Sequence, residues 1–431
     1  MIWTQTDYAG WGRALRASGE VARPESRADL AALSNAPAMG MRRSYGDAAL
    51  NSGGRAVDMS RFDRLLGFDA ETGLLEVEAG ARIGDIATAF APRGWMPAVM
   101  PGTGFATVGG CIGQDVHGKN HHNAGSFGQH VAEVTLLQNG VEATATPGSA
   151  LFEATMGGLG QTGLITCATL QMKRCKGDLM LVTERRANDW DEHLALLDGS
   201  TASYTVGWID ATARGADMGR GIVEEGENGA GLMKRRRGAH RVPMDAPHFA
   251  LAKPVVRAFN WAYFHRVPAH GRTLVRPLEA FFFPLDKIHD WNRLYGQRGF
   301  HQFQCVVPLG AAAALKAMLA EIAGSGLASP LAVLKRMGPG RAGYLSFPME
   351  GYTLAIDFPN RTEARVLIKR LEAMTAEAGG RLYFAKDSLA EGAAIRAMYP
   401  DLEKWQAEVA KADPQGALAT DLVRRLHLRT A

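Results

Sequence analysis

A glycine-rich stretch constrains the fold of this chain more than any other segment. It reads TVGGCIGQDVHGKNHHNAG, runs from Thr107 to Gly125, and holds five glycines, three histidines and one lysine. Glycine is used where the backbone adopts dihedral angles that other residues avoid, or where another group comes very close. Backbone N–H groups in such loops bind anions, and hydroxyls such as those of Ser44 and Thr107 add donors. We therefore expect this stretch to lie against a bound ligand.

The length and composition are those of an ordinary globular protein. The chain has 431 residues, of which 46% are apolar, so a large core and roughly two to three domains are expected. No apolar run approaches the ~18–20 residues of a membrane span, and the N-terminus does not read as a secretory signal. These features favour a cytoplasmic protein, which can still associate with the inner face of the membrane. The cysteines are widely spaced without a CxxC pair, which argues against zinc sites and disulfides: Cys111, Cys167, Cys175 and Cys305.

The three histidines of the glycine-rich stretch raise the question of a metal site. His117 and His121 are four residues apart and His122 adjoins, but Gly118 interrupts the helix that this spacing requires. We expect no metal, and a metal-dependent hydrolase is kept as the alternative from another class. Histidines and Lys119 beside a phosphorylated or redox ligand explain the pattern better. No GxGxxG fingerprint follows an opening strand and GxxxxGK[ST] does not occur, so neither a Rossmann nor a P-loop site is supported.

The first part of the chain reads as short strands separated by glycine turns, with no internal repeat and no low-complexity segment. Asn139-Gly140 is a hairpin signal, and a domain boundary is placed near 176–178. Strands are expected at 56–59, 64–69, 74–78 and 131–137, with a helix at 83–91.

From residue 300 the alternation of strands and helices becomes regular. The order is β-α-β-β-α-β, which is the ferredoxin-like split unit. Strands are expected at 300–307, 331–337, 352–357 and 381–386, with helices at 311–326 and 361–380. Helices cover one face of such a sheet, so the other face must meet another domain or a ligand.

Strand alternation predicts which side chains share a face of that sheet. In the strand 300–307, Phe303, Cys305 and Val307 lie on the apolar face, which leaves Gln302 and Gln304 on the other. Two glutamines on the face that needs a partner favour a ligand, although ordinary polarity of a sheet surface is the alternative.

Other strands add polar or small residues to the same region. Thr353 and Ala355 form the less apolar side of their strand, and Lys335 and Lys386 are expected at strand ends. We therefore expect a ligand flanked by two lysines.

The basic charge of the chain is concentrated in one segment. Residues 234–276 hold ten Lys or Arg and one acid, Asp245, whereas the whole chain has a net charge of +4. Basic residues beside aromatic ones suit anionic lipid headgroups or a lipid-linked phosphate, so peripheral membrane contact is expected here. A solvated basic loop is the alternative, and no nucleic-acid motif accompanies the segment. The neighbouring aromatic residues are Phe259, Trp261, Tyr263 and Phe264.

Three segments together resemble the vanillyl-alcohol-oxidase (p-cresol-methylhydroxylase) type of FAD flavoproteins. They are PGTGFATVGGCIGQDVHGKNHHNAGSFG at 101–128, MRRSYGD at 41–47 and RLYFAKDS at 381–388. Within that family they are most similar to the oxidases that act in the 2′-epimerisation of decaprenylphosphoryl ribose. The resemblance implies an α+β fold in which 1–178 and 381–431 form a two-part FAD-binding domain around a substrate domain at 179–380.

The resemblance also implies which residues hold the cofactor. Ala38 to Ala48 corresponds to the loop around the pyrophosphate. Related oxidases often attach FAD covalently through a histidine, but Arg43 stands at the matching position, so FAD is expected to be non-covalent. Arg42 replaces a glycine of these oxidases. The implied cofactor residues are Arg42, Arg43, Ser44, Tyr45, Gly46, Asp47, Gly102, Thr107, Val108, Gly109, Gly110, Gln114, Asp115, Val116, His117, Ile165 and Tyr383.

The activity implied is oxidation of the 2-hydroxyl of a polyprenylphosphoryl pentose to a 2-keto intermediate, a step toward an arabinan precursor of the cell wall. A separate NAD(P)H-dependent short-chain reductase would complete the epimerisation. Lys386 would engage the reacting hydroxyl and His117 would position the flavin. The sugar or its phosphate would be held by Tyr45, Gln302, Gln304, Lys335 and Lys119.

Departures from the family leave alternatives open. Thr353 and Ala355 stand where mycobacterial members have asparagine and cysteine, so the sugar can differ. A soluble sugar or alditol oxidase of the same fold is the second hypothesis, although the C-terminal histidine-tryptophan motif of sugar-lactone oxidases is absent. A non-catalytic flavoprotein is the third, but it gives no reason for Lys386.

Overall fold

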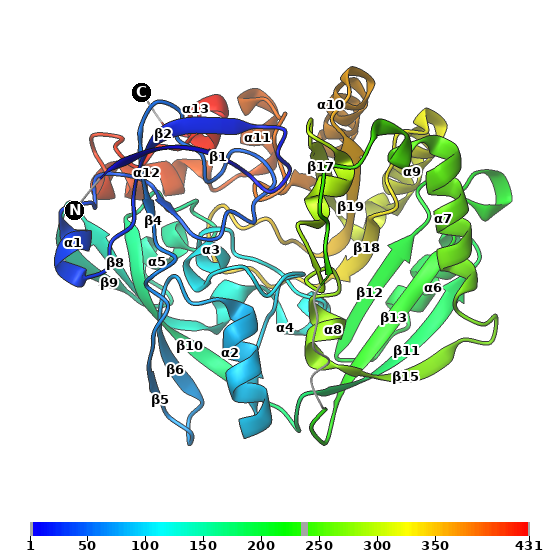
Figure 1. Cartoon of the computed structure of the whole chain (residues 1–431), viewed down its shortest axis with the longest axis horizontal. Helices are drawn as coiled ribbons and strands as arrows, with labels where there is room; N and C mark the ends of the chain where they lie inside the picture. The colour runs from blue at the N-terminus through cyan, green and yellow to red at the C-terminus, as the bar shows by residue number, and fades with distance from the viewer. Residues whose placement is uncertain (1–2, 234–239, 430–431) are drawn as a thin grey trace.

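A computed structural model describes residues 3–233 and 240–429 of the chain (Figure 1). The fold is mixed α/β and its sheets are mainly antiparallel, which confirms the predicted class. The KRRR segment at 234–237 lies outside the described residues. Among the residues that are described, no helix is both long enough and apolar enough to span a bilayer.

Residues before 175 form two sheets on the left of Figure 1. The strands are β1 (Thr4–Ala9), β2 (Arg16–Ala22), β3 (Ala38–Met39), β4 (Arg55–Asp58), β5 (Leu65–Phe68), β6 (Leu74–Glu78), β7 (Trp95–Pro97), β8 (Val131–Gln138), β9 (Val141–Ala145) and β10 (Leu164–Arg174). The orders are β1-β2-β4-β3 and β5-β6-β10-β8-β9, with β7 also paired to β10. The strands predicted here are confirmed, and so is the hairpin, since Asn139 and Gly140 both have positive φ.

Short helices connect these strands. They are α1 (Arg27–Ala31), α2 (Ile83–Phe90), α3 (Val108–Gly113), α4 (His121–Ala124) and α5 (Ala150–Thr155). The predicted helix at 83–91 is confirmed as α2, and its buried residues recur at helical spacing. Helix α3 begins inside the glycine-rich stretch, where the Thr107 hydroxyl accepts a hydrogen bond of 3.2 Å from Gly110 N–H.

An eight-stranded sheet occupies the right of Figure 1. Its strands are β11 (Leu179–Ala187), β12 (Tyr204–Ile209), β13 (Gly221–Gly229), β15 (Arg272–Pro277), β17 (Phe300–Val307), β18 (Ala332–Met337), β19 (Gly351–Pro359) and β20 (Arg381–Leu382). The order is β15-β11-β13-β12-β18-β19-β17-β20, and every neighbouring pair is antiparallel. Strands β14 (His240–Arg241) and β16 (Ile288–His289) pair separately.

The sheet consists of two halves with the same strand order. Helices α9 (Ala312–Ser325) and α10 (Thr362–Glu377) complete the predicted β-α-β-β-α-β unit, whose order β20-β17-β19-β18 confirms the ferredoxin-like pattern. The order β15-β11-β13-β12 repeats that pattern with helices α6 (Trp190–Asp198) and α7 (Lys253–His265). The sequence shows no repeat, so the duplication is visible only in the topology.

The two faces of this sheet are covered differently. Ile209 and Val223 pack with α6, α9 and α10 in one large core. Their sequence neighbours Trp208 and Ile222 point the other way and pack against Phe264 of α7. Helix α7 therefore lies on the face of the sheet opposite to α6. We call the face that carries α7 the cavity face.

The C-terminal segment returns to the N-terminal region. Helices α11 (Gly392–Met398), α12 (Leu402–Ala412) and α13 (Asp421–Arg425) lie beside the blue N-terminal strands in Figure 1. Arg425 binds both oxygens of Asp47 at 2.7 and 2.8 Å and Asp387 at 2.9 Å. One arginine thus joins the loop after β3 to the segment after β20.

The predicted strand 381–386 is wrong in its second half. Only Arg381–Leu382 pairs as β20, and the chain then turns, with the N–H groups of Lys386 and Asp387 donating to Tyr383 O at 2.9 Å each. Lys386 therefore lies in a tight turn, and Lys335 lies within β18 rather than at its end. The remaining helices are α8 (Leu278–Phe282) and the 3₁₀ segments η1 (Ala91–Arg93), η2 (Phe127–His130), η3 (Gly215–Asp217), η4 (His248–Leu251), η5 (Trp291–Tyr295) and η6 (Leu309–Ala311).

Candidate active site

A cavity of about 820 Å³ separates the N-terminal loops from the cavity face of the eight-stranded sheet. The loops 38–49 and 100–119 form one wall, and side chains from β17, β18 and β19 form the other. All the residues that the sequence predicts for catalysis and substrate binding line it: Tyr45, His117, Lys119, Gln302, Gln304, Lys335 and Lys386.

One end of the cavity is built from backbone, and we call it the glycine end. Gly40, Thr107, Gly109 and Gly110 line it. A Cβ at Gly40 would collide with the Thr107 side chain, and a Cβ at Gly109 would lie 3.1 Å from the Cβ of Ala79. Gly40 can approach Thr107, and Gly109 can approach Ala79, only because both glycines lack a side chain. The two glycines thus bring backbone segments close together at this end of the cavity.

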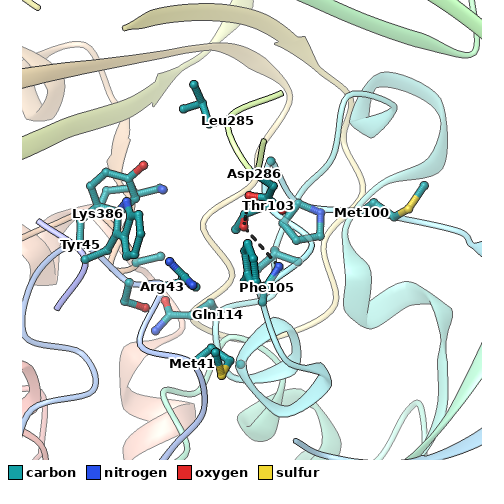
Figure 2. A pocket seen from close by; sticks show the side chains of 18 of the residues that line it. Met41, Arg43, Tyr45, Met100, Thr103, Phe105, Gln114, Leu285, Asp286 and Lys386 are labelled. Carbon is teal, nitrogen blue, oxygen red and sulfur yellow. Dashed lines mark hydrogen bonds between the residues drawn. The ribbon is translucent and has the colours of Figure 1, made fainter. Parts of the chain in front are cut away.

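Two arginines stand beside the glycine end. The Arg43 guanidinium carbon lies 4.1 Å from the Trp11 ring and 4.5 Å from the Phe105 ring, and Figure 2 shows it directed toward Phe105. Its buried Nε has no hydrogen-bond partner among the described residues, and burial lowers the pKa of Arg43. Arg42 adopts φ +49°, a left-handed conformation that suits glycine better than arginine.

At the other end, which we call the sheet end, Lys386 is fixed on the Tyr45 loop. Tyr45 N–H donates to Ala385 O at 2.8 Å, and Lys386 Nζ lies 3.6 Å from the centre of the Tyr45 ring (Figure 2). Burial lowers the pKa of Lys386, because the charged ammonium loses its hydration. The amine is thus held in one place and shifted toward its neutral form.

Asp357 is the buried counterpart of Lys386. It lies directly opposite Gln302 in the β17–β19 pair and accepts hydrogen bonds from Gln302 Nε2 at 2.5 Å and Tyr295 Oη at 2.9 Å. Burial raises the pKa of Asp357, and the nearby Lys386 cation opposes that rise. Each group favours the charged form of the other, so the two titrate together.

His117 joins two further side chains of the sheet end. Its Nδ1 lies 2.9 Å from Lys335 Nζ and its Nε2 lies 3.1 Å from Gln304 Nε2, while Gln304 also donates to Thr353 Oγ1 at 3.1 Å. Burial, and then the Lys335 cation, hold the pKa of His117 well below its usual value. Burial and the neighbouring lysines lower the pKa of Lys335 to about 7. A neutral imidazole has one acceptor nitrogen and one N–H, so it holds both side chains when Gln304 donates to Nε2 and the neutral amine of Lys335 accepts from Nδ1–H.

The other two histidines of the stretch form hydrogen bonds with backbone atoms. His121 Nδ1 accepts from Gly338 N–H at 3.1 Å, and His122 Nε2 lies 2.9 Å from Ala202 O. Within residues 3–233 and 240–429, no three side chains of His, Cys, Asp or Glu are grouped as metal ligands. The histidines are thus explained by packing between the stretch and the sheet.

Four of the predicted cofactor residues do not reach the cavity wall. Gly46 packs its Cα against the Asp387 carbonyl, so it permits close approach of two loops. Asp47 forms the ion pair with Arg425 and supports the loop from behind.

Val108 and Asp115 are the other two, and both are buried. Val108 belongs to the core around α2. Asp115 accepts from Gly128 N–H at 2.8 Å, Ser346 Oγ at 2.5 Å and Ala342 N–H at 3.2 Å. It ties the glycine-rich stretch to the loop before β19, which is a structural role.

Sequence reasoning missed part of each wall. Asp286, which accepts from Thr103 Oγ1 and Gly104 N–H at 2.7 Å each, lies near Phe105 in Figure 2. No pattern in the sequence places 286 beside 103. Beyond the sheet end, further residues line an arm of the cavity that no motif indicated: Val206, Trp208, Ile222, Glu224, Tyr263, Arg266 and Arg276.

Comparison with known proteins decides the family. The model of the FAD binding domain matches residues 21–143. Decaprenylphosphoryl-beta-D-ribose oxidase of Mycolicibacterium smegmatis is 38% identical over 410 residues, covering 91% of this chain and 89% of that oxidase. This chain belongs to the same family of oxidases. The family also shows that the protein is an FAD-dependent oxidoreductase and that FAD is its cofactor.

Two further relatives are less informative about activity. An uncharacterized protein from the mprA 5′ region of Streptomyces coelicolor is 34% identical over 78% of this chain and 97% of its own length. An uncharacterized oxidoreductase of Rhodococcoides fascians is 34% identical over 28% of each chain.

The residues of the glycine end fit FAD. The backbone surface at Gly40, Gly109 and Gly110 leaves room for a flat, extended ligand. The unpaired Nε of Arg43 is a buried donor that needs an acceptor, such as an oxygen of the cofactor. The ligand that the glycine-rich stretch was expected to contact is therefore FAD.

Proposed function

We propose that this protein oxidises the 2-hydroxyl of a polyprenylphosphoryl pentose to a ketone, the first half of a 2′-epimerisation. The observation that carries the proposal is the group of three buried lysines, Lys119, Lys335 and Lys386, in the cavity that continues from the glycine end. An anion that binds beside Lys119 and Lys335 would raise their lowered pKa values and pair with the ammonium groups, so these two favour an anionic ligand such as a sugar phosphate, while Lys386 serves as the base. The printed name of the Mycolicibacterium relative supports the same substrate class.

The architecture belongs to the same proposal. Residues 1–178 and 381–431 would form a two-part FAD-binding domain of the vanillyl-alcohol-oxidase type, with 179–380 as the substrate domain. The Arg425 contacts with Asp47 and Asp387 support this division, and so does the start of the eight-stranded sheet at Leu179.

Bound FAD supplies the two-electron acceptor for the alcohol carbon. Lys386 takes the hydroxyl proton, and its lowered pKa supports that role because a neutral amine is the base. Asp357 balances the ammonium that results, since each of the two groups favours the charged form of the other.

The remaining side chains hold the sugar. Gln304 and Lys335 are oriented by His117 and would bind hydroxyls or the phosphate, while Tyr45 packs beneath Lys386. Lys119 would bind the phosphate; its Nζ donates to Phe281 O at 2.6 Å and lies 3.7 Å from Glu224. Burial lowers the pKa of Lys119 and the Glu224 carboxylate opposes that change, and a bound phosphate would add to the effect of Glu224.

The ketone product requires a reducing partner to complete the epimerisation. We propose a separate NAD(P)H-dependent short-chain reductase, because a 2-keto sugar must receive hydride from the opposite face to invert the carbon. That partner would act on the released lipid-linked ketone.

The test is the visible spectrum of the FAD-loaded protein under anaerobic conditions. Polyprenylphosphoryl ribose should bleach the flavin, whereas free pentoses and alditols should not. Bleaching by the free sugars would replace the proposal with a soluble carbohydrate oxidase. A protein that none of these compounds reduces would refute the proposed substrate.

A further inference from the structure

The cavity extends well beyond the residues assigned to the sugar. Its wall crosses the cavity face from Gln302 on β17, through β19, β18 and β12, to Ile222 on β13. Neighbouring strands are about 4.8 Å apart, so four strand spacings amount to roughly 19 Å. A pentose ring beside Lys386 fills only the first part of that length. We call the part beyond Lys335 the far arm.

The far arm is lined by aromatic and aliphatic side chains. Trp208, Ile222 and Tyr263 face it, and the rings of Trp208 and Tyr263 are 4.7 Å apart. The arginines beside them are already paired, since Arg266 and Arg276 contact Glu184 at 2.7 and 2.5 Å. The Glu224 carboxylate also lines the arm and pairs with Arg276 at 3.1 Å. The charged groups of the arm thus pair with one another, and the rest of the lining is apolar or aromatic: Val206, Trp208, Ile222 and Tyr263.

Helix α7 continues this apolar surface to the outside of the molecule. Val255, Phe259 and Tyr263 are spaced four residues apart, so they form one stripe along the helix. Val255 and Phe259 are 45% and 50% exposed, and the Phe259 ring stacks on Tyr263 with centroids 5.9 Å apart. The stripe thus connects the far arm directly with solvent. We call it the α7 stripe.

Helix α7 is well packed on its buried side, so the exposure of the α7 stripe does not result from poor packing of the helix. Val256 and Phe264 lie on the buried side and face the sheet. Lys253 and Arg257 are also exposed, but on average they lie about 160° round the helix from Val255 and Phe259. A helix with one buried face and one exposed apolar stripe suits an apolar ligand that lies along the stripe.

We propose that the far arm and the α7 stripe form the track along which the isoprenoid chain of the substrate leaves the cavity. Lys119 stands between the sheet end and the far arm and marks the position of the phosphate. The chain then follows Trp208, Tyr263 and Phe259 outward. The inference deepens the proposed function and rests on it, because the isoprenoid chain and the phosphate are those of the substrate proposed there.

The experiment measures how affinity depends on chain length, without a sugar. FAD-loaded protein is titrated calorimetrically with dimethylallyl, geranyl, farnesyl and geranylgeranyl monophosphate below their aggregation limits. Affinity should rise with each isoprene unit, by roughly tenfold or more across the series, because each unit buries apolar surface. A flat series would overturn the proposal.

Matched variants locate the track. Phe259→Ser should remove most of the gain between farnesyl and geranylgeranyl monophosphate, and Tyr263→Ala should remove more of it. Trp261→Ser is the control, since Trp261 is 58% exposed on the same helix but off the α7 stripe. Equal losses in the Trp261 and Phe259 variants would overturn the assignment to the stripe. Circular dichroism and the FAD content of each variant verify folding.

Failure of the track and failure of the proposed sugar give different results. Chain-length dependence without bleaching by polyprenylphosphoryl ribose would support the track and refute the proposed sugar. Bleaching with a flat chain-length series would support the sugar and refute the track.

Discussion

At the glycine end of the cavity the wall is main chain, whereas at the sheet end it is made of side chains that project from strands. Gly40 and Gly109 are needed because they have no side chain, since a Cβ at either position would press against Thr107 or Ala79. Gln304 and Lys335 serve by their functional groups, and a strand can carry other groups without a change in its path. The comparison shows that binding of the cofactor is constrained by the path of the backbone. Binding of the substrate depends on side chains, which can be exchanged without a change in that path.

Replacing Lys386 gives the largest expected effect and separates the two ends most cleanly. Lys386→Ala should retain FAD with an unchanged yellow spectrum, because the glycine end is untouched. Its flavin reduction by substrate should slow by about 10²–10⁴-fold, which is the usual contribution of a general base. Anaerobic stopped-flow absorbance measures the rate, with the exposed Lys253→Ala as the control. A reduction rate near that of the wild type would refute the role of Lys386.

A side chain at Gly40 should affect the opposite end. Gly40→Val would push against Thr107 and displace the loop, at a cost of ~1–3 kcal/mol, or roughly 5- to 150-fold in the Kd of FAD. Fluorescence titration of the apoprotein measures the Kd, and Gly310→Val, where a Cβ meets nothing and φ is not positive, is the control. If Gly40→Val binds FAD as tightly as the wild type, the close approach of Gly40 to Thr107 does not shape the FAD site.

The pH dependence sharpens the description of the sheet end. The neutral amine is the base, so flavin reduction should rise with pH through the folded-state pKa of Lys386, lowered to about 7. The Asp357 carboxylate raises that pKa, and Asp357→Asn should therefore move the midpoint to lower pH, by about 1 unit. The pH profile of single-turnover reduction measures it. A lower plateau with an unmoved midpoint would mean that Asp357 only holds Gln302.

The smallest effect is expected from Thr353. Thr353→Asn changes the partner of Gln304 and should alter KM for the sugar by about 5-fold, the equivalent of one hydrogen bond worth ~1 kcal/mol. The Kd of FAD should not change. If the Kd of FAD shifts as well, a substitution at the sheet end alters the glycine end, and the two ends do not act separately.

Local patterns in the sequence predicted much of the sheet end. The alternation in 300–307 placed Gln302 and Gln304 opposite Phe303, and the structure confirms both faces. The alternation did not predict the turn at Lys386, because the chain there bonds to Tyr383 O and to Tyr45 N–H instead of continuing the pairing with β17.

The far arm was beyond sequence reasoning for a similar reason. Trp208, Ile222 and Tyr263 come from three elements that are brought together only by the strand order β13-β12 and by the side of the sheet on which α7 packs. Periodicity shows which face of a helix is apolar, but not which face of a sheet the helix covers.

The Arg425 clamp has a consequence for how the protein is made. It joins Asp47 to a residue 378 positions later, and the same guanidinium holds Asp387 beside Lys386. A nascent chain folds from its N-terminus as it emerges from the ribosome, so the sheets can form long before this contact does. The clamp between the two loops that frame the sheet end can therefore form only after residue 425 has been made. A chain that stopped before that residue would have its glycine loops without the contact that joins Asp47 to Asp387.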